Sequence, residues 1–207
     1  MARKHTKNQR RLTSRGAATR ARIVETAAAL VYAEGAGRPN LDDVMAASGT
    51  SKSQLYHYFA NKEALVREVI TLQTRRVLAA NGEHLDKLDS FAALRRWRDA
   101  MVALGQADGL FGGCPLGSLA NELANTSGPA RAALKGGFDD WAARIEAGLH
   151  AMQAEGTLKP SADPATLALA LLGAIQGGLL LAKLRRAVRP FEVAFDMALE
   201  HVARHAA

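Results

Sequence analysis

Apolar residues recur along most of this chain of 207 residues at the three- and four-residue spacing of one helix face. Between residues 17 and 34, Ile23, Ala27 and Leu30 share such a face, and Gly35 is placed to end the helix. No convincing run of alternating β-branched residues suggests a sheet, and aromatic residues make up only 5% of the chain. The pattern therefore predicts an all-α fold of about nine helices.

Capping residues mark two short helices in the first third of the chain. Asn40 is suited to cap a helix that has Asp43 at its third position and ends at Gly49. A brief turn follows, and Ser51 can cap the next helix. Because two helices joined by so short a turn must cross steeply, the sequence predicts a helix-turn-helix.

The second of these helices separates apolar from polar side chains. Leu55 and Phe59 lie four residues apart and are expected to face inward. Hydroxyls, amines and flat rings are the groups that contact phosphates, base edges and thymine methyls. The side chains left outward are Lys52, Ser53, Tyr56 and His57. A solvated surface helix would show the same pattern, so the helix alone leaves both interpretations open.

The distribution of charge favours DNA binding. The chain carries a formal net charge of +7. Residues 1–22 hold eight Lys and Arg, Arg20 and Arg22 among them, and no acid, while the rest of the chain holds 19 bases and 20 acids. We expect residues 1–16 to be a disordered arm that lies across phosphates or enters a minor groove. A solvated tail or an expression remnant is the alternative.

Residues 19–69, and above all LDDVMAASGTSKSQLYHYFANKEAL from Leu41 to Leu65, resemble the DNA-binding domain of TetR-type transcriptional regulators. The sequence differs from the family pattern at Thr50, where an apolar residue is usual, and at Ser53, where glycine is frequent. The GCPLGSLANEL segment is also similar to a TetR branch that includes LmrA- and YxaF-like regulators.

The resemblance implies a role for each matching residue. Lys52, Ser53 and Tyr56 would face base edges or adjacent phosphates, and Asn40, Tyr58 and Lys62 would clamp the DNA backbone. Lys62 also opens a helix, whose positive end favours a phosphate. A solvated Lys62, and a Tyr58 packed under the first helix, are the structural alternatives. The predicted DNA-binding residues are Arg20, Arg22, Asn40, Thr50, Ser51, Lys52, Ser53, Gln54, Tyr56, His57, Tyr58 and Lys62.

Six more helices are expected after the helix-turn-helix. They span residues 62–85 and 90–108 and then begin near Cys114-Pro115, Ser127-Gly128-Pro129, Asp163-Pro164 and Arg189-Pro190. We expect a DNA-binding domain at 17–62, with its motif at about 41–60, and a ligand-binding and dimerisation domain at 63–207. Residues 165–182 carry no charge, at the lower limit for a membrane span, but a buried helix is the preferred interpretation.

Reading duplex DNA with short helices usually needs a two-fold dimer. The last two helices are the candidates for the interface: the first is apolar on every side and contains Gly173, Gly177 and Gly178, and the second has a stripe through Phe191, Phe195 and Leu199. In TetR-like proteins the last two helices form this interface. Completion of the monomer core is the alternative.

The resemblance also implies a ligand cavity among the later helices. Its predicted lining is Trp97, Met101, Phe111, Cys114, Leu116, Phe138, Trp141, Ile145 and Gln176, although core packing is the preferred interpretation for any one of them on its own. Cys114 is placed at a helix N-terminus, where the dipole can lower the pKa of its thiol and make it reactive, but a buried packing role is the preferred interpretation.

These features predict a cytoplasmic homodimeric repressor that binds a palindromic operator in double-stranded DNA and is released by a small apolar inducer. The alternatives are a ligand-independent or architectural DNA-binding protein and a Cys114-based electrophile or redox sensor. No membrane contact, cofactor or metal is expected, since no second metal ligand stands near His57 at a suitable spacing. An enzyme is disfavoured because no GxSxG, Walker, HExxH or CxxC motif occurs.

Overall fold

The computed structural model describes residues 12–35, 37, 40–108 and 113–207. Helices account for the regular structure of these residues, which confirms the all-α prediction. The helices are α1 Ser14–Glu34, α2 Leu41–Ser48, α3 Lys52–Tyr58, α4 Lys62–Leu85, α5 Phe91–Asp108, α6 Pro115–Leu123, α7 Gly128–Ala154, α8 Pro164–Arg185 and α9 Arg189–Ala203. The capping residues predicted for α2, α3, α6, α7 and α8 are confirmed.

The first helix begins earlier than its sequence pattern suggests. Thr13 caps α1, and its hydroxyl accepts a hydrogen bond from the Gly16 N–H at 3.2 Å. The predicted disordered arm extended to Gly16, so its last three residues are in fact helical. Apolar periodicity missed this turn because its residues are solvated, whereas the cap is local. Residues 1–11 of the predicted arm lie outside the described part of the chain.

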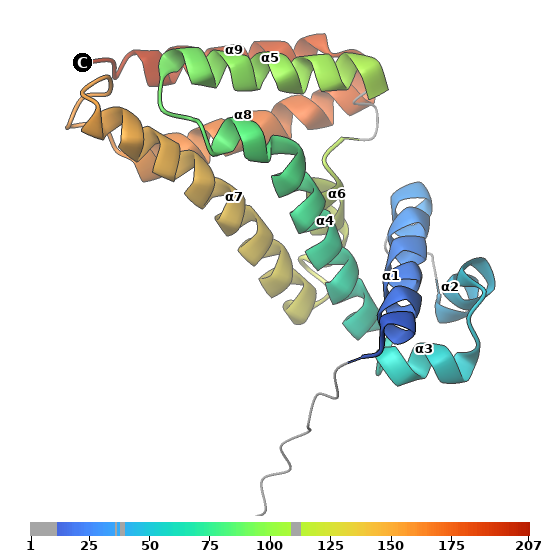
Figure 1. Cartoon of the computed structure of the whole chain (residues 1–207). Helices are drawn as coiled ribbons and strands as arrows, with labels where there is room; N and C mark the ends of the chain where they lie inside the picture. The colour runs from blue at the N-terminus through green and yellow to red at the C-terminus, as the bar shows by residue number, and fades with distance from the viewer. Residues whose placement is uncertain (1–11, 36, 38–39, 109–112) are drawn as a thin grey trace, which may run out of the picture.

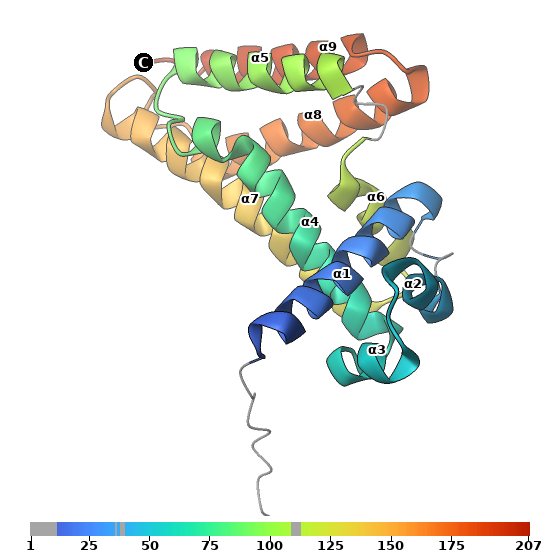
Figure 2. The ribbon, with the colours of Figure 1, turned by 45° about the vertical axis from the view of Figure 1, so that its right-hand side comes forward.

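The helices form two groups joined by α4. Figure 1 shows α1, α2 and α3 together at one end, with α4 leading from them towards α5, α7, α8 and α9. The view in Figure 2 shows α1 crossing the beginning of α4, and α5 and α9 lying side by side along α8. α4 packs on α1 at one end and on α7 along its length. A shift of α4 would therefore change the packing contacts of both groups.

The crossing of α4 and α7 is close. A Cβ atom on Gly137 of α7 would come within 2.5 Å of the Thr74 hydroxyl on α4, so only glycine fits there. The Thr74 hydroxyl and the indole N–H of Trp141 are buried at this crossing without hydrogen-bond partners among the described residues. Buried polar groups without partners are costly, so the close packing of α4 on α7 includes polar groups that oppose it.

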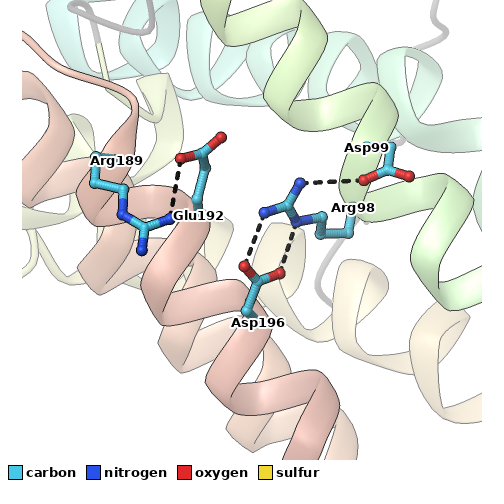
Figure 3. Close-up of polar contacts among 5 residues, drawn as sticks. All are labelled: Arg98, Asp99, Arg189, Glu192 and Asp196. Carbon is cyan, nitrogen blue, oxygen red and sulfur yellow. Dashed lines mark hydrogen bonds and ion pairs between the residues drawn. The ribbon is translucent and has the colours of Figure 1, made fainter.

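Aromatic packing and an ion pair hold α9 on α5. Trp97 of α5 meets the Phe195 ring edge-on, with centroids 5.1 Å apart, and donates its indole N–H to Asn81. Figure 3 shows Arg98 binding both carboxylate oxygens of Asp196, with Nε–Oδ1 at 2.7 Å and Nη2–Oδ2 at 2.8 Å. These hydrogen bonds raise the already high pKa of Arg98 further. Two parallel charged hydrogen bonds fix direction as well as distance, so they orient α9 on α5.

α8 is long and apolar enough to cross a membrane, and 44% of its most apolar window is buried in the fold. A core helix of a soluble protein meets the same test, so this helix alone is weak evidence for a membrane span. Its buried residues include Leu171 and Ile175, which are packed inside the core. The prediction of a helix buried on all sides is therefore wrong for one side of α8, where Leu169 and Leu184 are exposed, and right for the other.

Candidate DNA-binding and ligand-binding sites

The turn between α2 and α3 is fixed by local hydrogen bonds. Gly49 adopts the left-handed conformation, with φ 63° and ψ 35°, which ends α2 as predicted. Thr50 is only 7% exposed, and its hydroxyl lies 2.7 Å from the hydroxyl of Ser48. Thr50 was expected at the DNA, but its side chain is turned into the domain. The apolar residue usual at this position is replaced here by a hydroxyl that finds a buried partner.

The outward face of α3 matches the predicted polar surface. Lys52, Ser53, Tyr56 and His57 are exposed, while Leu55 is fully buried. Ser51 and Gln54 are exposed as well, but their side chains form a reciprocal capping box at the start of the helix. The box uses the Ser51 hydroxyl and the Gln54 Oε1 as acceptors, so Gln54 keeps only its amide NH₂ for DNA.

The two arginines predicted from α1 differ in availability. Arg20 pairs with Glu68 at 2.7 Å and lies over the Phe59 ring, so it ties α1 to α4. Arg22 is exposed. Tyr58 is half-buried, and its hydroxyl lies 3.4 Å from the Cβ position of Gly16, which agrees with the packed alternative for this ring. Of these three side chains, only Arg22 extends freely into solvent.

Asn40 and Lys62 each have an intramolecular role. The Asn40 Oδ1 accepts hydrogen bonds from the N–H groups of Asp42 and Asp43, which leaves its NH₂ group as a donor. The Lys62 ammonium donates to the Gly37 carbonyl at 3.3 Å and keeps further N–H groups. Both can still meet a phosphate through their remaining donors. The carboxylates of Asp42 and Asp43 lie beside Asn40, so this end of α2 is acidic.

Most of the predicted ligand-cavity residues are packed in the core. Trp97, Leu116, Trp141 and Ile145 are at most 1% exposed, and Met101 is half-buried against the core. Phe111 lies outside the described residues. The sequence could not separate core from cavity here, because both are apolar and follow the same helical spacing.

Phe138 and Gln176 do line a hollow. It measures about 550 Å³ and lies between α6, α7 and α8, and we call it the α6–α8 groove. Its other walls include Asn121 and Lys183. The Gln176 Nε2 is buried without a hydrogen-bond partner among the described residues. The groove therefore combines an apolar wall with an unpaired amide donor, as small-molecule sites commonly do.

Cys114 caps α6, as predicted, but it is not activated. Its Sγ accepts a hydrogen bond from the Gly117 N–H at 3.5 Å, and its side chain is 8% exposed. Burial raises the pKa of the Cys114 thiol, and this outweighs the lowering by the Gly117 N–H and by the nearby Gln176 amide, which lies outside hydrogen-bond geometry. The structure therefore agrees with the preferred packing role and not with the reactive thiol, because desolvation exceeds the effect of the surrounding hydrogen-bond donors.

A second hollow of about 210 Å³ lies where α1, α4 and α6 meet, and we call it the α1–α6 cavity. It includes Gln73 of α4 and again Lys183 of α8. Sequence reasoning missed both residues. The signal for Gln73 was available, since it continues the inward series Leu65, Val69 at four-residue spacing with a polar side chain. Lys183 gave no such signal.

Apolar side chains are exposed along one side of α8 and α9. We call this the α8–α9 face, and it contains Leu169, Leu180, Leu181, Leu184, Val193 and Met197. Gly173 and Gly177 lie in the same stripe, with open space above them. The sequence placed Phe191, Phe195 and Leu199 in the outer stripe of α9, but the two phenylalanines are fully buried and Leu199 is half-buried. Gly178 packs against Phe191 and so is internal.

Comparison with known proteins agrees with this architecture. Residues 23–69 match the family described as bacterial regulatory proteins, tetR family, and residues 90–198 match the tetracyclin repressor-like C-terminal domain. The chain belongs to the TetR family. The predicted resemblance is confirmed, and proteins of this family are transcriptional regulators rather than enzymes. No group of three or more potential metal ligands occurs among the residues that the structure describes.

Individual relatives extend over most of this TetR-family chain. It is 27% identical over 183 residues to an uncharacterized HTH-type transcriptional regulator in the lacX 3' region of Lactococcus lactis, covering 86% of this chain and 90% of the relative. It is 31% identical over 134 residues to the regulator YxaF of Bacillus subtilis, covering 64% and 70%. A TetR regulator from Chloroflexus aurantiacus superposes with a TM-score of 0.78 at 26% identity, covering 94% and 98%.

Proposed function

We propose that this TetR-family regulator is a cytoplasmic homodimeric repressor that binds a palindromic operator and is released by a small apolar inducer. The proposal rests above all on the exposed polar face of α3. In that face Lys52, Ser53, Tyr56 and His57 project from a helix whose other side is locked into the domain by Leu55 and Phe59. We assign base contacts to Lys52, Ser53 and Tyr56, and backbone contacts to Asn40, Lys62 and Arg22.

The α8–α9 face supports dimerisation. Leu184 is 71% exposed and Met197 is 62% exposed, although both belong to helices whose opposite sides are in the core. Covering such side chains with those of a second copy removes apolar surface from water, at about 25 cal/mol per Å². Gly173 and Gly177 would let two α8 helices approach closely, because no side chain stands above them. A two-fold axis through this face would carry both α3 helices to successive major grooves, about 34–36 Å apart.

We place the inducer in the α6–α8 groove. Its volume of about 550 Å³ is in the usual range for small ligands, and Phe138 provides an apolar wall. An inducer that accepts a hydrogen bond from Gln176 would satisfy the buried Nε2. Leu180 and Leu184 belong both to this groove and to the α8–α9 face, so the second copy would lie at its edge.

The path to the DNA runs through α4 and α6. Ser127, the cap of α7, donates its hydroxyl to Glu63 in the first turn of α4 at 2.9 Å, and Arg76 of α4 pairs with Glu25 of α1. A ligand that favours a different position of α6 and α7 would therefore shift α4 and, with it, α1 and the recognition helix. We draw the division between the DNA-binding and regulatory domains at the beginning of α4, near residues 62 and 63.

Footprinting of DNA upstream of the protein's own gene and its neighbours tests the proposal. We expect protection of a palindrome with half-sites one helical turn apart, and loss of protection with a compound from a metabolite and drug panel. A footprint without sequence preference would indicate an architectural protein. A palindromic footprint that no compound affects would leave a constitutive repressor. Release by electrophiles or oxidants that is lost in Cys114→Ser would favour the sensor alternative over ligand binding.

A further inference from the structure

The α1–α6 cavity lies between the two groups of helices. Its apolar walls are Ala28 and Val31 of α1, Val69 of α4 and Leu119 of α6. Figures 1 and 2 both show α6 beside the C-terminal end of α1, so the cavity is bounded by the DNA-binding part on one side and the regulatory part on the other. An occupant would touch α1 directly, unlike an occupant of the α6–α8 groove.

Gln73 places on the cavity wall an amide group that has no hydrogen-bond partner among the described residues. Its side chain is 8% exposed and lines the cavity, and no described residue forms a hydrogen bond with its amide. A glutamine in this position carries two donors and an acceptor that folding removes from bulk water. The Gln73 amide is not among the fully buried atoms without a partner, so it is accessible from the cavity and can bind a molecule inside it.

Lys183 supplies a cation at the same cavity. Its aliphatic chain packs on Gly113, with Cδ 3.2 Å from the position of a Cβ there, and no acid among the described residues forms an ion pair with its ammonium. The carboxylate that also borders the cavity, Glu122, lies against the end of α1, with Oε2 3.0 Å from the Cβ position of Gly35. Ser118 adds a hydroxyl. Gln73, Ser118 and Lys183 thus offer hydrogen-bond donors to the space from three different helices.

We propose that the α1–α6 cavity binds a small organic carboxylate with an apolar body. The carboxylate would be recognised by donors from Gln73, Ser118 and Lys183, and the body would pack on Val31 and Leu119. A cavity of about 150 Å³ lined by apolar side chains admits benzene. The α1–α6 cavity is larger, at about 210 Å³, and has room for one substituted ring. This site adjoins the proposed inducer groove, since Ser118, Glu122 and Lys183 border both, but its occupant would contact α1 and would set the spacing between α1 and α6.

The test uses 4-fluorobenzoate as probe and the DNA-free full chain as target, with ¹⁹F NMR line broadening as the readout. We expect binding with a Kd in the millimolar range, as befits ten non-hydrogen atoms. Gln73→Leu, which replaces the amide by an apolar group of similar size, should weaken binding at least tenfold. Lys183→Gln should weaken it several-fold. The neutral analogue 4-fluorobenzamide should bind more weakly than the acid to the unaltered protein.

Gln176→Leu is the matched control, because it removes the other unpartnered glutamine, in the α6–α8 groove. Binding of 4-fluorobenzoate should be unchanged in this variant. If Gln73→Leu fails to give a cooperative thermal transition, Gln73→Glu takes its place, and its added carboxylate should also repel the probe. The proposal is overturned if the unaltered chain does not bind the probe, if Gln73 substitutions leave binding unchanged, or if the benzamide binds equally well. Because no operator DNA is used, these outcomes do not depend on repression.

Discussion

The outward face of α3 and the α8–α9 face are both uncovered, but they are built by opposite means. α3 has seven residues, and its exposed side chains are polar and locally positioned by a capping box. α8 has 22 residues and exposes leucines and open glycines on one side while burying leucines on the other. A polar, rigid surface of this kind is suited to phosphates and base edges, and an apolar one to a second copy.

In the proposed regulator, operator binding depends on both faces together. A single short helix contacts too few base pairs for a specific affinity, so the polar face of α3 gains its specificity from pairing. In the proposed dimer the apolar face would supply that pairing without contacting DNA. Damage to either face should therefore reduce operator binding, but only damage to the α8–α9 face should change the oligomeric state.

Charged substitutions in the α8–α9 face should have the largest effect on operator affinity. Leu184→Glu combined with Met197→Glu places two charges in the apolar stripe, and we expect a monomer with operator affinity reduced by about 1000-fold, because the second half-site is lost. Sedimentation and gel-shift titration measure the two effects. Leu104→Glu is the control, since Leu104 on α5 is also exposed, at 48%, but lies outside this face. A double variant that stays dimeric would disprove our assignment of the interface.

Removing residues 1–11 should affect DNA of any sequence. The deletion takes away five basic residues and keeps Thr13, the cap of α1. Each phosphate contact contributes about 0.9 to the slope of log affinity against log salt, so loss of five such contacts would flatten the slope by about 4.5 per protomer. Titrations at several salt concentrations measure it, with operator and random DNA in parallel. An unchanged slope would show that this segment does not contact phosphates.

Substitutions in α3 should lower operator affinity without affecting the dimer. Tyr56→Ala and Lys52→Ala remove proposed base contacts, and each should cost about 1–3 kcal/mol, a factor of roughly 10 to 100. Affinity for random DNA should change far less in Tyr56→Ala. Tyr32→Ala is the matched control, because Tyr32 is exposed on α1 away from α3. Equal losses on operator and random DNA would assign Tyr56 to the backbone instead.

The smallest effect should come from the ion pair that orients α9. Arg98→Met removes the bidentate contact with Asp196, which neighbours Met197 of the α8–α9 face. We expect the free energy of unfolding to fall by about 1–3 kcal/mol, with weaker dimerisation at low protein concentration. Lys135→Met, in the exposed pair with Asp139, should cost less than about 0.5 kcal/mol. Denaturant titration gives both values, and equal costs would mean that Arg98 adds no more than a surface charge.

The two faces also differ in how well they were predicted. On α3, the cap Ser51, the buried Leu55 and the outward Lys52 and Tyr56 all follow from neighbouring residues, and the structure agrees. On α9, the stripe through Phe191 and Phe195 was predicted to face outward, but the exposed apolar residues are Val193 and Met197. Phe191 and Phe195 are inside because Trp97 and Gly178 meet them there, and these contacts are distant in the chain.

The ligand cavities show the same limit. Of the residues predicted to line a ligand cavity, Phe138 and Gln176 border the α6–α8 groove, whereas Trp97 and Trp141 fill the core. Cys114 was correctly placed as a helix cap, but its pKa depends on how deeply the surrounding helices bury it. The sequence did not predict that Lys183 borders the α1–α6 cavity, because Lys183 belongs to α8, a helix distant in the chain.

The sequence by itself determined the helices, their caps and turns, the basic character of the first residues and the polar face of α3. Each of these depends on hydrogen bonds, charges or side-chain periodicity within a few residues. Only the tertiary structure decided which apolar side of α8 and α9 is exposed, that Arg20 and Thr50 serve the fold, and that Gln73 and Lys183 border one cavity. Burial and partnership at these positions are set by packing between helices, and apolar spacing is the same for a core, a cavity and an interface.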